Sequence, residues 1–222
     1  MKKSLYKLLF FALWMKPLAF IMLGLNIVRV GTLPTEGPSV VIANHNSHLD
    51  ALILMSLYPL RIINQVRPVA AADYFFKNKY LKWFATRCLD IVPIDRQNSK
   101  LNETFEICNT ALNNGQILLL FPEGSRGNPE ELGKIKKGLF YMLKDRADLT
   151  GLKIVPVFMY GLGKALPRGE ALLVPFNVDV IIGKALVFPE TSKDFVGAIG
   201  QTFQDLQSYC LHKGVFQELK DE

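Results

Sequence analysis

Short apolar runs alternate with helix-patterned stretches through most of this 222-residue chain. Six of the runs are expected to be strands, because they are short and several are rich in β-branched residues: Ser39–Ala43, Val69–Ala72, Ile91–Ile94, Gln116–Phe121, Ile154–Tyr160 and Val178–Ile182. Helices are expected between them, at residues 48–58, 74–88, 100–113, 135–146 and 193–212. Strands that alternate with helices predict an α/β fold, a mostly parallel sheet flanked by helices on both faces.

The first thirty residues carry a different pattern, two apolar runs that Lys16 separates, Leu8–Met15 and Pro17–Leu25. In a single transmembrane span Lys16 would lie near the bilayer centre, at a cost of about 2.5–3.5 kcal/mol. Two short helices lying in the membrane interface are therefore preferred. A pair of buried core helices and a single tilted span are the alternatives. We expect residues 1–30 to be membrane-associating helices and residues 31–222 to form one further domain.

The composition narrows the class of partner. A net charge of +6 favours anionic partners such as phosphate groups or a membrane surface. No nucleic-acid-binding signature accompanies this charge, so nucleic acid is not expected as a partner. Three cysteines, far apart and without a C-x-x-C pair, argue against a disulfide framework or a zinc site. They favour a reducing compartment.

Residues 44–50 read Asn-His-Asn-Ser-His-Leu-Asp and join the first predicted strand to the first predicted helix. On one continuous helix, His45 and Asp50 would lie about 500° apart around the axis, so they meet only where the chain changes course. We place His45 on the loop at the carboxyl end of the strand and Asp50 in the first helical turn. Open α/β sheets hold their sites at that end, and the pair would form a general base with its orienting carboxylate. The same residues also fit a capping box of Ser47 and Asp50, with His45 as a surface loop residue. His48 is expected to be an ordinary surface or core-edge histidine.

Charged residues follow two further predicted strands, in the segments Asp95-Arg96 and Glu123-Gly124-Ser125-Arg126. The forked donors of Arg96 and Arg126 suit a phosphate group, and Gly124 permits close approach of the backbone to a ligand. Glu123 would hold an arginine in place or bind a substrate hydroxyl. Each arginine alone also fits a surface salt bridge. The lysines at 134, 136 and 137 add positive potential.

Together these segments resemble the glycerolipid acyltransferase family, the PlsC-type group of lysophosphatidic-acid-acyltransferase-like proteins. Its four blocks occur here in order, as N-H-x-S-x-x-D at 44–50, V-P-I-D-R at 92–96, F-P-E-G-S-R at 121–126 and V-P-V at 155–157. The chain departs from the pattern at Pro93, where a bulky or aromatic residue is common, and in the acidic stretch that follows Arg126. These departures concern the acceptor more than the reaction.

The resemblance implies transfer of a fatty acyl group from acyl-CoA or acyl-carrier protein to a lysophospholipid hydroxyl. The expected acceptor is 1-acyl-sn-glycerol-3-phosphate, which would give phosphatidic acid. The resemblance assigns catalysis to His45 and Asp50, and acceptor binding to Arg96, Glu123, Gly124, Ser125 and Arg126. It implies no metal or other cofactor, and a place on the cytoplasmic face of a membrane, the inner membrane in a bacterium. The alternatives are glycerol 3-phosphate or another lysolipid as acceptor, a non-catalytic lipid-binding protein, and a thioester hydrolase in which His45 activates water.

Overall fold

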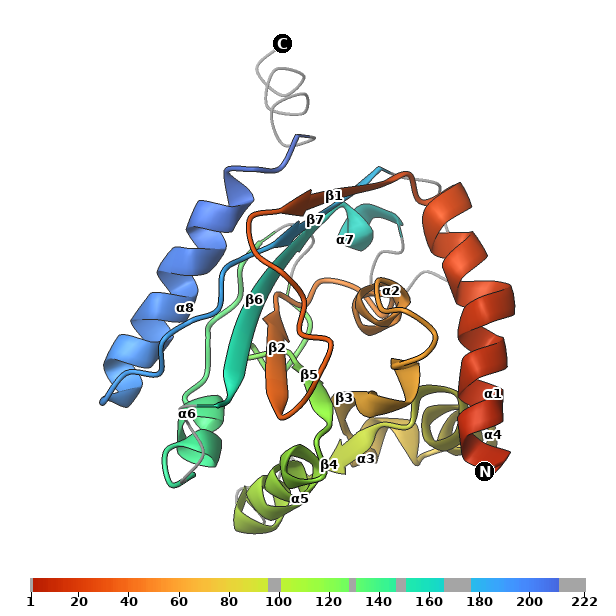
Figure 1. Cartoon of the computed structure of the whole chain (residues 1–222), viewed down its shortest axis with the longest axis horizontal. Helices are drawn as coiled ribbons and strands as arrows, with labels where there is room; N and C mark the ends of the chain where they lie inside the picture. The colour runs from red at the N-terminus through yellow and green to blue at the C-terminus, as the bar shows by residue number, and fades with distance from the viewer. Residues whose placement is uncertain (1, 96–100, 128–130, 147–150, 166–176, 212–222) are drawn as a thin grey trace.

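The computed structural model describes residues 2–95, 101–127, 131–146, 151–165 and 177–211. A seven-stranded sheet runs through its centre in the order β1-β7-β6-β2-β5-β3-β4 (Figure 1). The strands are β1 (Leu25–Arg29), β2 (Ser39–Ala43), β3 (Val66–Ala71), β4 (Val92–Ile94), β5 (Ile117–Leu120), β6 (Lys153–Tyr160) and β7 (Val178–Ile182). Neighbouring strands run parallel except β6 and β7, which are antiparallel. The predicted mostly parallel α/β sheet is confirmed.

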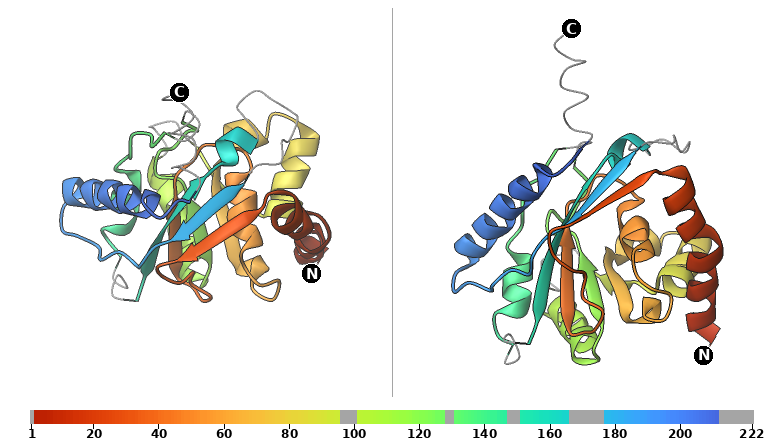
Figure 2. Two further views of the ribbon diagram at one scale, coloured as in Figure 1. Left: turned by 90° about the horizontal axis from the view of Figure 1, so that it is seen from above. Right: turned by 45° about the horizontal axis from the view of Figure 1, so that its top comes forward.

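Helices cover both faces of this sheet, as the two views of Figure 2 show. The α-helices are α1 (Lys2–Phe10), α2 (Asp50–Ser56), α3 (Ala72–Phe75), α4 (Lys79–Phe84), α5 (Leu101–Asn113), α6 (Gly138–Leu143), α7 (Leu162–Ala165) and α8 (Ser192–Gln207). Strand β2 is buried throughout, and its alternate residues enter two different cores. Val41 and Ala43 pack with α1 and α2, whereas Val40 and Ile42 pack with α5, α6 and α8. Burial on both faces explains why the central strands read as continuous apolar runs.

The N-terminal helix differs from the two short helices expected. Helical structure continues from α1 through two π-helical turns, Phe11–Met15 and Leu18–Met22, and Pro17 keeps helical backbone angles between them. The stretch Leu5–Met22 is long and apolar enough to cross a membrane, judged by length and composition alone. We call this run, Lys2–Met22, the N-terminal helix.

The N-terminal helix is docked against the domain along its length. Every fourth position from 11 to 19 carries an apolar side chain that is buried in the core, and Leu23, directly after the helix, continues this spacing. Two lysines add hydrogen bonds to backbone carbonyls, because Lys7 Nζ donates to Val66 O and Lys16 Nζ donates to Ser56 O, each at 2.6 Å. Burial lowers the pKa of Lys7 to about 7. The helix therefore belongs to the folded domain as well as presenting a surface of its own.

Other elements also depart from the sequence prediction, among them α7, for which no helix was expected. Strand β1 is absent from the predicted strands, because its apolar residues directly follow the apolar helix and resemble a continuation of it. The sheet therefore begins at Leu25, inside the segment 1–30 that was expected to be helical. The helix expected at 74–88 is instead α3, α4 and a π-helical turn, Ala85–Leu89. Asn78 separates α3 from α4, since its extended backbone starts a new helix and its side chain accepts the Tyr80 N–H.

Candidate active site

Asn44 fixes the loop that leaves β2. Its side-chain Nδ2 donates to Met159 O at 2.8 Å, and its Oδ1 accepts from Met159 N at 2.7 Å. The backbone pairing of β2 with β6 ends at Ala43 and Val157. The Asn44 side chain continues the contact between the two segments beyond that point. The sequence pattern predicts no role for Asn44 by itself. The available signal was a polar residue directly after a fully apolar strand.

His45 and Asp50 meet as the sequence predicts. His45 Nδ1 lies 2.8 Å from Asp50 Oδ2, and the same oxygen accepts the backbone N–H groups of Asn46 at 2.7 Å and Ser47 at 2.9 Å. Because a carboxylate only accepts, we assign the imidazole proton to Nδ1 and the lone pair to Nε2. The Asp50 side chain is 1% exposed and that of His45 is 21% exposed, so the carboxylate is sealed while the ring remains reachable.

The capping interpretation and the general-base interpretation describe the same carboxylate. Asp50 reaches back to the Ser47 N–H as the acid of a capping box does. The other half of the box is absent, because Ser47 Oγ accepts the Leu49 N–H at 3.3 Å and α2 begins only at Asp50. The helix start therefore positions the acid that holds the imidazole.

Glu123 lies behind His45. Its Oε1 accepts the His45 N–H at 2.9 Å and its Oε2 accepts the Gly133 N–H at 3.0 Å. The side chain is 4% exposed and is not part of the cavity lining. Burial raises the pKa of Glu123, and the two backbone N–H groups oppose that shift. The carboxylate thus joins two loops with backbone hydrogen bonds. Its expected contact with a substrate hydroxyl or an arginine stays a prediction.

A basic residue, Arg126, lines the same cavity as His45. Arg126 Nη1 donates to His48 Nε2, and the His48 ring stacks on Tyr74 with centroids 5.6 Å apart. Burial lowers the pKa of His48, and the charge of Arg126 lowers it further. His48, expected to be an ordinary surface or core-edge histidine, is instead a direct neighbour of the predicted phosphate-binding arginine. Its position in the same loop as His45 was the signal for this.

Gly124 allows a second cation to come close. Its φ is +73°, and a Cβ placed there would lie 2.8 Å from Lys136 Nζ. A residue with a side chain would therefore be strained and would displace the ammonium group. Ser125 is exposed beside these residues, whereas Arg96 lies outside the described residues.

A cavity of about 600 Å³ joins these parts. Its polar side is lined by His45, Ser125, Arg126 and Lys136, and the Phe121 ring stacks on His45 with centroids 4.2 Å apart. Its apolar side includes Ile94, Leu101, Phe105, Cys108, Leu139 and Met142. No cluster of His, Cys, Asp and Glu suited to a metal ion occurs among the described residues. The arrangement offers a positioned base, cationic groups and an apolar hollow in one space.

Comparison with known sequences covers this region. A family model described as Acyltransferase matches residues 25–160. The chloroplastic 1-acyl-sn-glycerol-3-phosphate acyltransferase LPAT1 of Arabidopsis thaliana is 32% identical over 166 residues, 73% of this chain and 43% of that protein. A Dictyostelium discoideum protein named Taffazin is 31% identical over 157 residues, 66% of this chain and 54% of that protein. The chain therefore spans about half the length of these curated relatives.

The fold also matches a solved structure. The crystal structure of the 1-acyl-sn-glycerophosphate acyltransferase PlsC from Thermotoga maritima superposes with a TM-score of 0.68, over 92% of this chain and 80% of that one. Sequence identity in this superposition is 19%. At that identity the likeness establishes the shared architecture of the sheet and its helices.

Proposed function

This chain belongs to the PlsC-type glycerolipid acyltransferase family, and on that premise we propose that it acylates a lysophospholipid. The donor would be a thioester, acyl-CoA or acyl-carrier protein, and the acceptor 1-acyl-sn-glycerol-3-phosphate, which would become phosphatidic acid. The observation that carries the proposal is the 2.8 Å contact of His45 with a buried carboxylate beside the cavity.

In the proposed mechanism His45 is the general base. Its Nε2 takes the proton of the acceptor hydroxyl as that oxygen attacks the thioester carbonyl. The tetrahedral intermediate collapses, the carbon–sulfur bond breaks, and the imidazolium returns the proton to the leaving thiolate. Asp50 stabilises the imidazolium and keeps the ring in the required tautomer. The acceptor itself is the nucleophile, so no acyl-enzyme is required, and the resemblance implies no metal or prosthetic group.

The cationic side of the cavity would hold the acceptor. Arg126 supplies forked donors and Lys136 a compact charge, both suited to a phosphate group, while Ser125 and the Gly124 backbone would bind the glycerol portion. Arg96 keeps its proposed role in acceptor binding on the resemblance alone. The apolar side of the cavity would take acyl chain. This division leaves the reacting hydroxyl next to His45.

The enzyme would work at the cytoplasmic face of a membrane. Both the acceptor and the product are lipids, and thioester donors are cytoplasmic. The apolar surface of the N-terminal helix, with Leu13 and Trp14 among its most exposed residues, supports membrane association. One side of the N-terminal helix is buried in the core. This packing supports a helix that lies along the membrane surface more than one that spans the bilayer.

Purified full-length protein tests the activity directly. It is incubated with acyl-CoA or acyl-carrier protein and a mixed pool of lysolipids, and the products are identified by mass spectrometry. Phosphatidic acid is expected as the main product, with at least a hundredfold less in His45→Ala, since a positioned general base contributes about 10²–10⁴-fold. Fatty acid release that is equal with and without acceptor would indicate a hydrolase. A different acylated lysolipid would reassign the acceptor, and a protein that binds lipid without turnover would be a binding module.

A further inference from the structure

The N-terminal helix is not the only described element with exposed aromatic side chains. A second group lies on α4 and just before it. Tyr80 is 72% exposed, Trp83 is 50% exposed and Phe76 is 37% exposed. Tyr80 and Trp83 are three residues apart on α4 and therefore share a face. We call these three residues the α4 patch. Large exposed aromatic groups that lie together mark a surface built for contact.

The α4 patch is continuous with the exposed side of the N-terminal helix. The rings of Tyr6 and Trp83 meet edge to face with centroids 5.6 Å apart, and those of Phe10 and Phe84 do so at 5.1 Å. Figures 1 and 2 show α1 and α4 side by side at the same flank of the molecule. Leu9 is also exposed on α1. One apolar surface therefore crosses from the first helix to the fourth.

Positive charge surrounds the α4 patch. Between Tyr74 and Leu89 the sequence holds four basic residues and no acidic one. Lys79 Nζ lies 5.1 Å from the centre of the Tyr80 ring, and Lys82 Nζ lies 5.1 Å from the centre of the Phe76 ring. Aromatic rings with a polar edge and lysines on long stems are the groups that seat proteins at headgroup level. The charge favours anionic lipid in particular.

We propose that the α4 patch is a second membrane contact, which seats α4 on anionic lipid beside the N-terminal helix. This contact would place the cavity close to the membrane, because Tyr74 and Phe75 of α3, just before the patch, line the cavity. With α4 on the bilayer, that cavity wall lies next to the lipid from which an acceptor would come. This role of the contact rests on the proposed lipid acceptor, whereas the contact itself is a binding property that needs no turnover.

The two tryptophans, Trp14 and Trp83, allow each contact to be read separately. In Trp14→Phe, Trp83 is the only tryptophan. Its fluorescence emission should shift to the blue when phosphatidylcholine vesicles containing phosphatidylglycerol are added. Lipids with brominated acyl chains should quench that fluorescence. In Trp83→Phe, Trp14 reports on the N-terminal helix in the same way. If the Trp14 signal responds and the Trp83 signal does not, only the N-terminal helix binds and the proposal is overturned.

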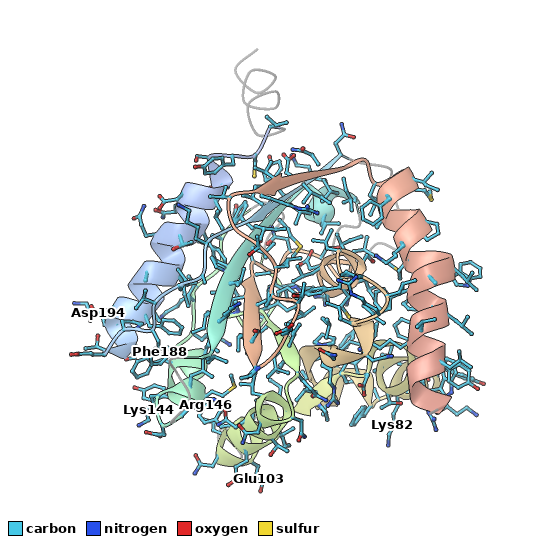
Figure 3. The ribbon with its side chains drawn as sticks, in the orientation of Figure 1. Lys82, Glu103, Lys144, Arg146, Phe188 and Asp194 are labelled. Carbon is cyan, nitrogen blue, oxygen red and sulfur yellow. The ribbon has the colours of Figure 1, made fainter. Side chains whose placement is uncertain are left out.

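Vesicle co-sedimentation measures what the α4 patch contributes. Tyr80→Ser should weaken binding to the anionic vesicles about threefold to tenfold, the worth of one interfacial aromatic side chain. Lys79→Glu with Lys82→Glu should weaken binding to anionic vesicles and leave the weaker binding to pure phosphatidylcholine unchanged. The matched control is Tyr141→Ser on α6, which removes a ring that is 44% exposed and has Lys144 Nζ 5.5 Å from its centre. Figure 3 places Lys144 and Lys82 on opposite sides of the molecule.

The outcomes separate this proposal from the proposed reaction. Turnover of detergent-dispersed lysolipid by Tyr80→Ser should equal that of the unmodified protein, because Tyr80 does not line the cavity. Equal vesicle binding by Tyr80→Ser, the lysine variant and Tyr141→Ser would overturn the membrane contact even if acyl transfer is found. Self-association in vesicle-free solution that Tyr80→Ser abolishes would also overturn it, since the occupant would then be a second copy of the chain.

Discussion

The two sides of the proposed site differ in how they are held. On the base side, Asp50 and Glu123 are buried and accept hydrogen bonds from backbone N–H groups of the loops around His45. On the cationic side, Arg126 contacts another side chain, His48, and Lys136 is exposed. Backbone bonds fix a position closely, whereas exposed side chains adjust to what they bind. The base side should therefore set the rate of the chemical step, and the cationic side should set which acceptor is bound.

Asp50→Asn tests the base side with the largest expected effect. The amide keeps the shape but loses the charge that stabilises the imidazolium, so kcat should fall by about 10²–10⁴-fold with little change in the acceptor KM. Because Asp50 also starts α2, this variant should be less stable as well, by about 1 kcal/mol. His45→Ala is the matched control, since it removes the base and leaves that capping contact intact. Rates near that of the unmodified protein in both variants would rule out the pair as the base.

Glu123→Gln asks whether this residue positions the base or binds the acceptor. Glutamine accepts only through its single oxygen, and its NH₂ group would face one of the two backbone N–H groups. We expect kcat to fall about tenfold and the free energy of unfolding to fall by about 1–3 kcal/mol. The acceptor KM should stay near its original value, measured by initial rates over a range of lysolipid concentration. A rise in the acceptor KM without a fall in kcat would show that Glu123 binds the acceptor and does not position the base.

Arg126→Ala addresses the cationic side. Loss of a charge-assisted hydrogen bond to phosphate should raise the acceptor KM about tenfold, equivalent to about 1.4 kcal/mol, with kcat nearly unchanged. A lysolipid that lacks the phosphate charge serves as the control substrate and should show no such change. If both acceptors lose the same factor, Arg126 supports the structure of the site and does not recognise phosphate.

His48 gives the smallest and most specific effect, a pH dependence. Its Nε2 accepts from Arg126, which requires the neutral ring, and burial together with the Arg126 charge holds the pKa of His48 below the usual range for histidine. Below that pKa the imidazolium no longer accepts and repels Arg126, so the acceptor KM should rise about twofold to threefold as the pH falls. His45, Asp50, Arg126 and Tyr74 are the charged or titratable groups around it.

His48→Gln keeps a hydrogen-bond acceptor that does not titrate, so its acceptor KM should stay level over the same pH range. The comparison uses the acceptor KM alone, because KM reports acceptor binding whereas kcat reports the chemical step. A parallel rise of KM in the variant would show that His48 is not the group responsible.

The sequence predicted the parts of the molecule that depend on local pattern. The limits of β2 and β7 agree with the expected ranges, because both strands are buried, short and rich in β-branched residues. The contact of His45 with Asp50 follows from one strand, one loop and one helix start. Such features need only the chain within a few residues of the motif.

The rest depends on contacts between distant segments. The role of Glu123 follows from the parallel pairing of β2 with β5, which brings residue 123 to the His45 N–H, and from the return of the chain at Gly133. His48 became a partner of Arg126 by the same convergence. Strand β1 pairs only with β7 among the described strands, and β7 lies far along the chain. Side-chain type alone does not distinguish a carboxylate that binds backbone from one that faces a ligand.

The edge pairing of β1 with β7 has a consequence for how the molecule is made. Asn26 and Asp179, joined through their side chains at 2.7 Å, are 153 positions apart. At about 5–20 residues per second, a ribosome needs roughly 8–30 seconds to deliver the second partner after the first. During that interval the nascent chain has already released an apolar helix and an unpaired strand, while the segment that completes the sheet is still untranslated. Strand β1 is thus among the last strands of this sheet to gain its partner.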